Sequence, residues 1–389
     1  MSDEVKSLTV GVPRETYPGE RRVALIPSSV TALKKAGVTV ILEAGAGTGA
    51  GYADADYSTV GAQMVASRGE VFAAADVILQ VRAAGANRHA ARADFDSLRA
   101  GQSLIGLCDP FSDPKLMEEL AGRNVSCFAL ELLPRITRAQ SMDVLSSMAS
   151  IAGYKAVILA ANLVPKIYPM MMTAAGTITA AKVFIIGAGV AGLQAIATAR
   201  RLGAVVKATD VRSAAKENVL SLGAKFVDMG VEDAAGVGGY AKGMDEGFYR
   251  RQQAALAPTI AESDVIITTA AVPGKKAPLL ISADAVRSMS PGSLVVDLAA
   301  EQGGNCELTK PGETIVENGV SVIGCVNLPS TVPFHASQMF SRNVTAFLLL
   351  LVKEGRWAIN RDDEIVQGTL VTADGQVVHP KVRELLAPV

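Results

Sequence analysis

The feature that most constrains the fold is a glycine-rich turn between an apolar run and a helical pattern. The sequence KVFIIGAGVAGLQAIATARRLGAVVKATDVR starts with β-forming residues and then reaches a turn formed by Gly187, Ala188, Gly189, Val190, Ala191 and Gly192. Gly187 permits a sharp reversal of the chain, and Gly192 lets the following helix pack closely on the strand. A second apolar run, AVVKATD, follows the helix. This order predicts two parallel strands joined by a helix.

The same turn has the spacing that binds the pyrophosphate of a dinucleotide. Gly189 would let the backbone approach the phosphates, and the helix start would offer them N–H groups and a positive dipole end. Asp210 ends the next strand, 18 residues beyond Gly192. A carboxylate there should meet the adenosine ribose hydroxyls and repel a 2′-phosphate, which favours NAD(H) over NADP(H). We also assign Val211 and Arg212 to this site. An Arg so close could instead favour NADP(H), although it more often supports the Asp.

Residues at the ends of later strands are expected to line the nucleotide path. In an open α/β sheet the carboxyl ends of the strands face the ligand, and Thr268, Thr269 and Ala270 end one such strand. Asn327, in VNLPS, is a further candidate, with a turn-forming residue as an equal alternative. The insert DMGVEDAAGVGGYAKGMDEGFYRRQQ is interpreted as a mobile flap that closes over bound nucleotide, with Tyr240 as its anchor. The alternative is a plain surface loop.

The pattern of apolar runs indicates an α/β fold with two Rossmann-like, doubly wound parallel-sheet domains and a cleft between them. One series of short β-rich runs fills the N-terminal part, and a second series begins at KVFIIGAG. The helical stretch SSMASIAGYKAVILAANLV should cross from one domain to the other. We expect the tail to return, so that residues 1–145 and 335–389 form the first domain and residues 146–334 form the second.

Composition argues against several classes of function. There are 37 Lys and Arg residues and 38 Asp and Glu residues, so the formal net charge of −1 indicates neither nucleic acid nor a membrane surface as a partner. The start MSDEVK is not a signal peptide, and no run reaches the ~18–20 apolar residues of a membrane span. The longest run, VTAFLLLLV (344–352), is interpreted as a buried helix. The cysteines lack metal-ligand spacing, which predicts reduced thiols, no metal site and a cytoplasmic protein.

A polar cluster lies in the segment LLPRITRAQSMDVLSS, which contains no His, Cys or Lys. Its members are Arg135, Gln140, Asp143 and Ser146. Such a set can orient a ligand but offers none of the usual acid–base or covalent groups. On residue types alone, the alternative is a polar hinge held by salt bridges. The histidines neighbour neither this cluster nor the glycine turn in the sequence, so a catalytic histidine is not expected. They are His89, His335 and His379.

Together these motifs resemble a known family. The segments KVFIIGAGVAGLQAIATARRLGAVVKATDVR, PRITRAQSMDVLSS, YPMMMTAAGT, GGYAKGM and DLAAEQGGNC are similar to the NAD(H)-binding subunit (alpha subunit, domain I) of proton-translocating nicotinamide nucleotide transhydrogenase. The resemblance covers nearly the whole chain, through GTLVTADGQVVHP near its end. Alanine dehydrogenase shares the fold and the segments GVPRET and ERRVALIPSSV.

The resemblance implies a Re/Si-specific enzyme in which hydride passes directly from NADH on this chain to NADP+ on a partner subunit. Arg135, Gln140, Asp143 and Ser146 would hold the nicotinamide end of NAD(H) in the interdomain cleft. The family also implies a homodimer, an NADP(H)-binding subunit and a membrane proton-channel subunit. The chain would then lie at the inner face of the cytoplasmic membrane through its partners, without inserting into it.

Two other interpretations stay open. One is an alanine dehydrogenase-like, NAD-dependent amino-acid dehydrogenase. That family is expected to use a Lys and a His at the positions that match Arg82 and Cys108 here, and the loss of both argues against this activity. The other is a non-catalytic module that senses NAD.

Overall fold

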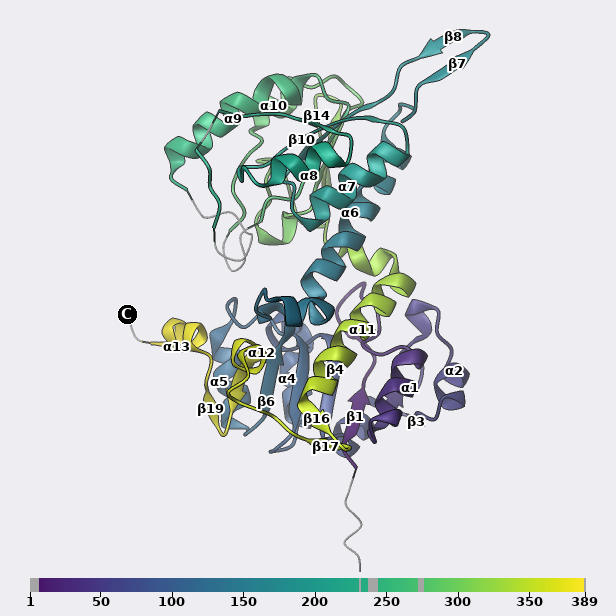
Figure 1. Cartoon of the computed structure of the whole chain (residues 1–389), viewed down its shortest axis with the longest axis vertical. Helices are drawn as coiled ribbons and strands as arrows, with labels where there is room; N and C mark the ends of the chain where they lie inside the picture. The colour runs from purple at the N-terminus through teal and green to yellow at the C-terminus, as the bar shows by residue number, and fades with distance from the viewer. Residues whose placement is uncertain (1–6, 231, 237–243, 272–275, 388–389) are drawn as a thin grey trace, which may run out of the picture. The chain divides into compact units, whose positions relative to one another are not determined.

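The chain folds into two units, each built around its own sheet (Figure 1). The computed structural model describes residues 7–230, 232–236, 244–271 and 276–387. The first unit comprises Met1–Met148 with Ser330–Val389, and the second comprises Ala149–Pro329. The division expected from the sequence, 1–145 with 335–389 and 146–334, differs from these limits by only a few residues.

The first unit contains an eight-stranded sheet with the order β19-β18-β6-β5-β4-β1-β2-β3. The first six strands of the chain pair in parallel, whereas β18 pairs antiparallel with β6. The C-terminal segment therefore supplies the last two strands of this sheet. The strands are β1 (Thr9–Val12), β2 (Thr39–Glu43), β3 (Gln63–Val65), β4 (Val77–Arg82), β5 (Ser103–Leu107), β6 (Ser126–Ala129), β18 (Leu370–Ala373) and β19 (Gln376–Val377).

Helix α11 (Pro333–Leu351) belongs to the core of the first unit. It begins at a proline, which the first helical turn tolerates. Phe340 and Phe347 are fully buried, and the Ser337 hydroxyl accepts a hydrogen bond of 3.0 Å from the Val23 N–H. The run 344–352 lies in α11 up to Leu351, and Val352 begins strand β16 (Val352–Lys353). The other helices are α1 (Pro27–Lys35), α2 (Asp54–Thr59), α3 (Arg68–Ala74), α4 (Arg88–Ser97), α5 (Pro114–Gly122), α12 (Glu364–Thr369) and α13 (Pro380–Leu386).

The second unit contains a seven-stranded sheet with the order β11-β10-β9-β12-β13-β15-β14. All pairs are parallel except β14 with β15. The chain proceeds from β9 to β10 and β11 on one side and later adds β12 on the other side, so the strand order reverses between β9 and β12. The strands are β9 (Lys182–Ile186), β10 (Val205–Thr209), β11 (Lys225–Phe226), β12 (Val265–Thr268), β13 (Leu294–Asp297), β14 (Thr314–Glu317) and β15 (Val320–Gly324).

Both faces of the second sheet are buried. Along β9, Val183 and Ile185 belong to one core cluster, whereas Phe184 and Ile186 belong to another. Alternate side chains of a strand point to opposite faces, so a strand covered on both sides must be apolar throughout. This explains the unbroken run VFII before the glycine turn. The helices of this unit are α7 (Val190–Arg201), α8 (Ala215–Ser221), α9 (Glu246–Ala261) and α10 (Ala283–Arg287).

Helix α6 (Val144–Leu163) connects the two units. Among the described helices it is the one long and apolar enough to cross a membrane by length and composition. No segment of this kind was expected from the sequence, because polar residues such as Lys155 interrupt the apolar run. Ala156, Val157 and Ala160 are fully buried in the core of the second unit, so this part of α6 packs as the core helix of a folded domain does.

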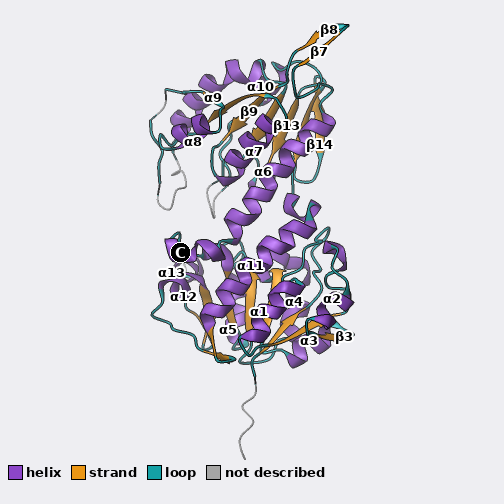
Figure 2. Cartoon of the chain, turned by 45° about the vertical axis from the view of Figure 1, so that its right-hand side comes forward, coloured by secondary structure: helices purple, strands orange, loops and turns teal. Residues whose placement is uncertain are grey.

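A two-stranded hairpin follows α6 and extends away from the second sheet (Figure 2). Its strands, β7 (Met171–Thr173) and β8 (Gly176–Ile178), pair antiparallel, and all six of their residues are exposed. A hairpin that stands alone in water is marginally stable. The hairpin of this chain is therefore an arm with little support from the unit that carries it.

Candidate functional site

The glycine turn lies where the strand order of the second sheet reverses, at the carboxyl ends of β9 and β12. The Gly187 N–H donates to the Thr209 carbonyl at 2.9 Å, and the Thr269 hydroxyl donates to the Gly187 carbonyl at 3.0 Å. Gly187 has a φ of +101°, a conformation that glycine adopts without steric cost. Ligands of open α/β sheets bind at this kind of reversal, so the structure places the predicted turn at the expected edge.

The turn and helix α7 approach each other too closely for side chains. A Cβ on Gly192 would lie 1.8 Å from the Gly187 carbonyl oxygen. By contrast, a Cβ on Gly189 would meet only the Arg212 guanidinium, at 3.9 Å. Gly189 precedes the first residue of α7, and no side chain caps this helix. Its N-terminal amides and positive dipole end are therefore directed at a space that an anion can enter.

Gly153 supports the turn from helix α6 and was not among the residues singled out from the sequence. A Cβ at this position would lie 2.1 Å from the Ala191 carbonyl oxygen in the first turn of α7. The two helices therefore touch through backbone atoms beside the glycine turn. An isolated glycine in a helical pattern is a known sign of close packing, so the sequence contained the signal but not the identity of the partner.

Asp210 binds the turn directly. Its carboxylate accepts hydrogen bonds from the Ala188 N–H at 2.7 Å and from the Arg212 guanidinium at 2.8 and 2.7 Å. The Asp210 side chain is only 5% exposed, and its hydrogen bond raises the pKa of Arg212. The predicted ribose-binding carboxylate thus also fixes the turn, and Arg212 accompanies it. Val211, between them, accepts a backbone bond from the Ala234 N–H at 3.0 Å.

The residues after β12 are held by a buried carboxylate that was not singled out from the sequence. Asp297, at the end of β13, is fully buried and accepts bonds from the Thr268 hydroxyl at 3.0 Å and the Thr309 hydroxyl at 2.7 Å. It also accepts the Asn305 N–H at 2.7 Å. Thr268 is therefore fully buried and bonded to Asp297. Contact between Thr268 and a nucleotide stays a prediction.

Asn305 transmits this support to the turn. Its side-chain amide donates to the Ala270 carbonyl at 2.8 Å and accepts from the Ala270 N–H at 3.1 Å, so both backbone polar groups of Ala270 are engaged. The adjacent Thr269 hydroxyl binds Gly187. A chain of hydrogen bonds thus joins the ends of β13, β12 and β9.

Asn327 and Tyr240 are the two remaining residues that were predicted to bind the nucleotide. Asn327 has a φ of +46°, the left-handed conformation that Asn tolerates in turns, and its N–H donates to Glu301 at 3.4 Å. This geometry agrees with the turn-forming alternative and leaves a ligand contact as a prediction. Tyr240 lies outside the described residues.

Within the predicted polar cluster of the first unit, Asp143 and Ser146 contact each other. The Asp143 carboxylate accepts bonds from the Ser146 N–H at 2.9 Å and the Ser146 hydroxyl at 2.5 Å, which caps the start of α6. Arg135 and Gln140 have exposed side chains on the segment that leads into this cap. The 3₁₀ helix η4 (Thr137–Met142) carries Gln140 and ends immediately before Asp143. The four residues thus border one short, accessible segment.

Arg82 and Cys108 occupy the two positions where alanine dehydrogenase is expected to use a Lys and a His. The Arg82 guanidinium carbon lies 4.2 Å from the centre of the Tyr17 ring. Cys108 is fully buried with its Sγ 3.5 Å from the Sγ of Cys127, and this hydrogen bond together with burial raises its pKa well above the usual range. Such a thiol stays protonated at neutral pH. All four cysteines are free and buried.

Two buried carboxyl groups of the first unit, on Glu15 and Glu131, bind backbone N–H groups. Burial raises the pKa of Glu15 to about 8 and that of Glu131 to about 7. Each carboxyl accepts backbone N–H groups, from residues 81 and 82 for Glu15 and from residues 108 and 109 for Glu131. Burial lowers the pKa of His379. All three histidines lie in the first unit, whereas the glycine turn lies in the second.

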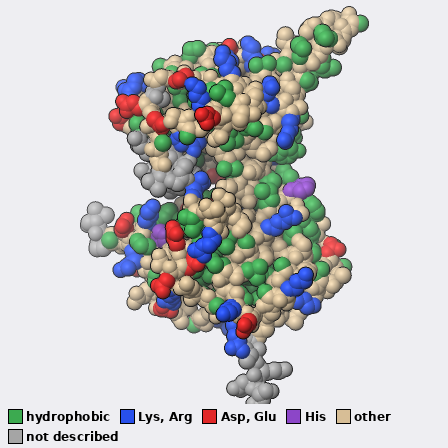
Figure 3. All heavy atoms as spheres, in the orientation of Figure 1, with side chains coloured by type: hydrophobic (Ala, Val, Ile, Leu, Met, Phe, Trp, Pro, Cys, Tyr) green, Lys and Arg blue, Asp and Glu red, His purple; other side chains and the backbone are tan. Residues whose placement is uncertain are grey.

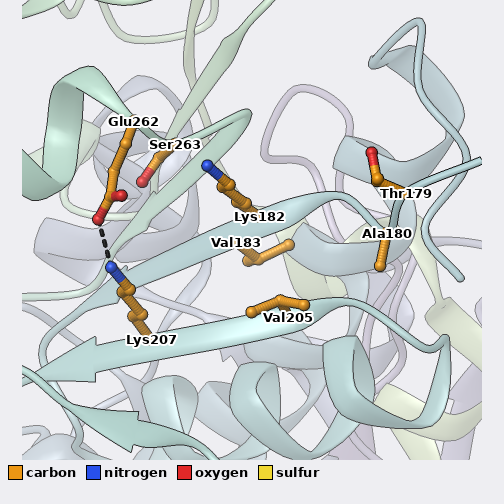
Figure 4. Close-up of a pocket in the computed structure, with 8 residues that line it drawn as sticks. All are labelled: Thr179, Ala180, Lys182, Val183, Val205, Lys207, Glu262 and Ser263. Atoms are coloured by element: carbon orange, nitrogen blue, oxygen red, sulfur yellow. Dashed lines mark hydrogen bonds and ion pairs between the residues drawn. The ribbon is translucent and has the colours of Figure 1, made fainter. Parts of the chain in front are cut away.

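A pocket of about 230 Å³ lies near the amino ends of β9 and β10, whereas the glycine turn follows the carboxyl end of β9 (Figure 4). Val183 and Val205 form part of its lining, and Lys207 is ion-paired with Glu262 beside them. Nucleotides bind at the carboxyl ends of such strands. This pocket is at their amino ends and is therefore separate from the glycine turn.

Glycine substitutions should separate packing from binding at this site. Gly192→Ala and Gly153→Ala would place a methyl group against backbone oxygen, and each should lower the free energy of unfolding by about 1–3 kcal/mol. Gly189→Ala has room in the protein but projects into the anion space. It should keep its stability and weaken NADH binding. Denaturant unfolding and NADH fluorescence titration measure both; a Gly189→Ala variant with unchanged NADH affinity would contradict this assignment.

Comparison with known proteins identifies the family of this chain. Family models for the alanine dehydrogenase/PNT N-terminal and C-terminal domains match residues 11–152 and 156–380. The first part of the NAD(P) transhydrogenase subunit alpha of Rhodospirillum rubrum is 44% identical over 96% of this chain and 98% of its own length. The crystal structure of transhydrogenase from Sinorhizobium meliloti has a TM-score of 0.83 and 43% identity, covering 96% of this chain and 99% of that one.

An L-alanine dehydrogenase structure is a more distant match. It has a TM-score of 0.78 and 26% identity, covering 97% of this chain and 99% of that one. The fold is thus common to both enzymes, while the sequence lies much nearer to the transhydrogenases. The chain belongs to the alanine dehydrogenase/PNT family and, within it, to the NAD(P) transhydrogenase alpha subunits.

Proposed function

We propose that this chain binds NAD(H) and passes hydride directly between NADH and NADP+ held by a partner subunit. The observation that carries this proposal is the combination of a glycine turn with the dinucleotide-binding spacing at the carboxyl ends of β9 and β12 and a polar segment that lacks His, Cys and Lys. Hydride transfer between two nicotinamide rings releases no proton from an alcohol or amine. It therefore requires no general base on the protein.

Direct hydride transfer requires instead that the two nicotinamide rings are correctly oriented. The two reacting carbons must approach to roughly 3–3.5 Å in an aligned geometry, and exclusion of water assists the transfer. In this proposal the glycine turn binds the pyrophosphate, and Arg135, Gln140, Asp143 and Ser146 orient the nicotinamide end. The protonated state of Cys108 supports the absence of proton chemistry at the position where alanine dehydrogenase is expected to use a His.

The preference for NAD(H) is assigned to Asp210. Its negative charge beside the turn would repel a 2′-phosphate, and its bidentate bonds to Arg212 occupy the guanidinium that could otherwise bind one. The charge balance of this pair is therefore the proposed determinant of specificity.

Three further assignments complete the proposal. An NADP(H)-binding subunit would supply the second nicotinamide, and a membrane proton-channel subunit would couple the reaction to proton movement. The chain would then be cytoplasmic and peripheral at the inner face of the membrane. The Rhodospirillum rubrum relative is one subunit of a transhydrogenase, which supports the existence of such partners.

A homodimer is proposed through the hairpin arm. Hydrophobic side chains lie along this arm (Figure 3), and Met170, Met172 and Ile178 are 61%, 80% and 42% exposed. Exposed apolar groups on a poorly supported hairpin are typical of a surface that a second chain covers. A second copy of the chain would bury the hairpin arm, which is exposed to solvent in a single chain.

The specificity proposal predicts the behaviour of Asp210→Asn. Loss of the charge should reduce the preference for NADH over NADPH by about tenfold or more, because charged hydrogen bonds contribute about 1.5–3 kcal/mol and the released Arg212 can bind the 2′-phosphate. Adding Arg212→Ala should remove any gain in NADPH affinity. Fluorescence titration with both nucleotides measures the preference; equal preferences in wild type and Asp210→Asn would exclude this role.

The dimer proposal predicts that Met172→Lys yields monomers without loss of folding. Desolvating a lysine in the interface is unfavourable, whereas the residue is largely exposed within one chain. Light scattering coupled to size exclusion gives the mass. Val316→Lys, at a valine of the same unit that is 65% exposed, is the control and should leave the mass unchanged. A dimer that survives Met172→Lys at dilute concentration would argue against the arm.

The proposed reaction predicts hydride exchange between nucleotides and no amino-acid oxidation. Mixed with the NADP(H)-binding component of its own complex, the chain should reduce an NAD+ analogue of distinct absorbance with electrons from NADPH. The chain alone should show no turnover with NAD+ and L-alanine. Robust alanine oxidation would favour the dehydrogenase alternative. NADH binding without exchange would favour the NAD-sensing module.

A further inference from the structure

The segment that carries Arg135 and Gln140 is fastened to the C-terminal part of the chain. In η4, Ala139 and Met142 are buried, while Gln140 is exposed. From α11, the side-chain amide of Asn343 donates to the Ser141 carbonyl at 2.8 Å. A 3₁₀ helix has weaker hydrogen-bond geometry than an α-helix, so the pose of this segment depends on such outside contacts.

A second attachment is a charged fork. The Arg138 guanidinium donates two hydrogen bonds to the Asp363 carboxylate, at 2.7 and 2.8 Å. Asp363 precedes α12, and its carboxylate also accepts the Ile365 N–H at 2.8 Å, which caps that helix. The fork therefore joins η4 to a fixed helix start that is 225 residues away in the sequence.

This ion pair contributes more to the orientation of its segment than to the stability of the fold. Arg138 is 52% exposed and Asp363 is 13% exposed, and an ion pair in such a setting adds little to folding. Two parallel bonds between planar groups, however, fix both the direction and the rotation of the guanidinium. A fork of this kind holds its own segment in one orientation relative to α12.

We propose that Arg138 and Asp363 are a positioning pair that holds the Arg135–Asp143 segment in the pose required for hydride transfer. The inference rests on the function proposed above, because that segment orients the nicotinamide end of NADH. The pair acts through its neighbours and does not touch the nucleotide. Misplacing a reacting group by about 1 Å can cost about 10²-fold in rate, so a small shift of η4 is sufficient.

The test uses variants that change the fork in separate ways. Arg138→Ala removes it, and Arg138→Lys keeps the charge without the bidentate geometry. Asp363→Asn keeps an acceptor oxygen for the Ile365 N–H but loses the carboxylate. Arg361→Ala is the matched control, because Arg361 lies in the same part of the chain and forms an exposed ion pair with Asp374 rather than with a residue of η4.

The measurements are kcat and KM for hydride exchange with the NADP(H)-binding component, the Kd for NADH, and Tm. Arg138→Ala and Asp363→Asn should each lower kcat by about tenfold or more, with Kd changed less than about threefold and Tm nearly unchanged. Arg138→Lys should fall between them and wild type. The double variant should be no worse than either single one, because both remove one interaction. Arg361→Ala should match wild type.

The possible outcomes distinguish the inference from the proposed function. If wild type exchanges hydride and the fork variants keep its kcat, the positioning role is wrong and the function stands. If the fork variants lose kcat only in proportion to lost Tm, the pair is merely structural, which also overturns the inference. If wild type with its partner exchanges no hydride, the proposed function fails and the positioning role fails with it.

Discussion

The structure of the second unit depends on backbone atoms that meet where side chains would not fit. The carbonyl of Gly187 lies 1.8 Å from where a Cβ of Gly192 would be, and the carbonyl of Ala191 lies 2.1 Å from where a Cβ of Gly153 would be. Three segments therefore converge beside the first turn of α7. Their convergence directs the helix amides at the open space beside Gly189, where we propose that the pyrophosphate binds.

Two carboxylates hold the two sides of this turn, by different routes. Asp210 binds the Ala188 N–H directly, and its charge is balanced by Arg212. Asp297 acts at a distance, through Asn305, which holds Ala270 next to Thr269. A rigid site costs a ligand less conformational entropy on binding. The polar segment of the first unit has a comparable design, since it is anchored to the C-terminal part of the chain by Asn343 and Asp363.

Local sequence patterns predicted the α/β fold with its two large, mostly parallel sheets, the glycine turn, and the position of Asp210 after β10. Each of these features is contained in a short stretch with regular spacing. The remaining supports join residues that are remote in sequence, such as Gly153 with Ala191 and Arg138 with Asp363, and spacing carries no information about such pairs. Asp297 lay in a quoted motif, but its five-fold role as an acceptor emerges only when the loops around it are folded.

The pairing of β18 with β6 has a consequence for how the molecule is made. During synthesis the second unit, Ala149–Pro329, leaves the ribosome complete while the first still lacks α11, β18 and β19. The edge of β6 stays unpaired until β18 emerges, and open strand edges invite association with other chains. The second unit can therefore fold first, whereas the sheet of the first unit is completed only after β18 has been made.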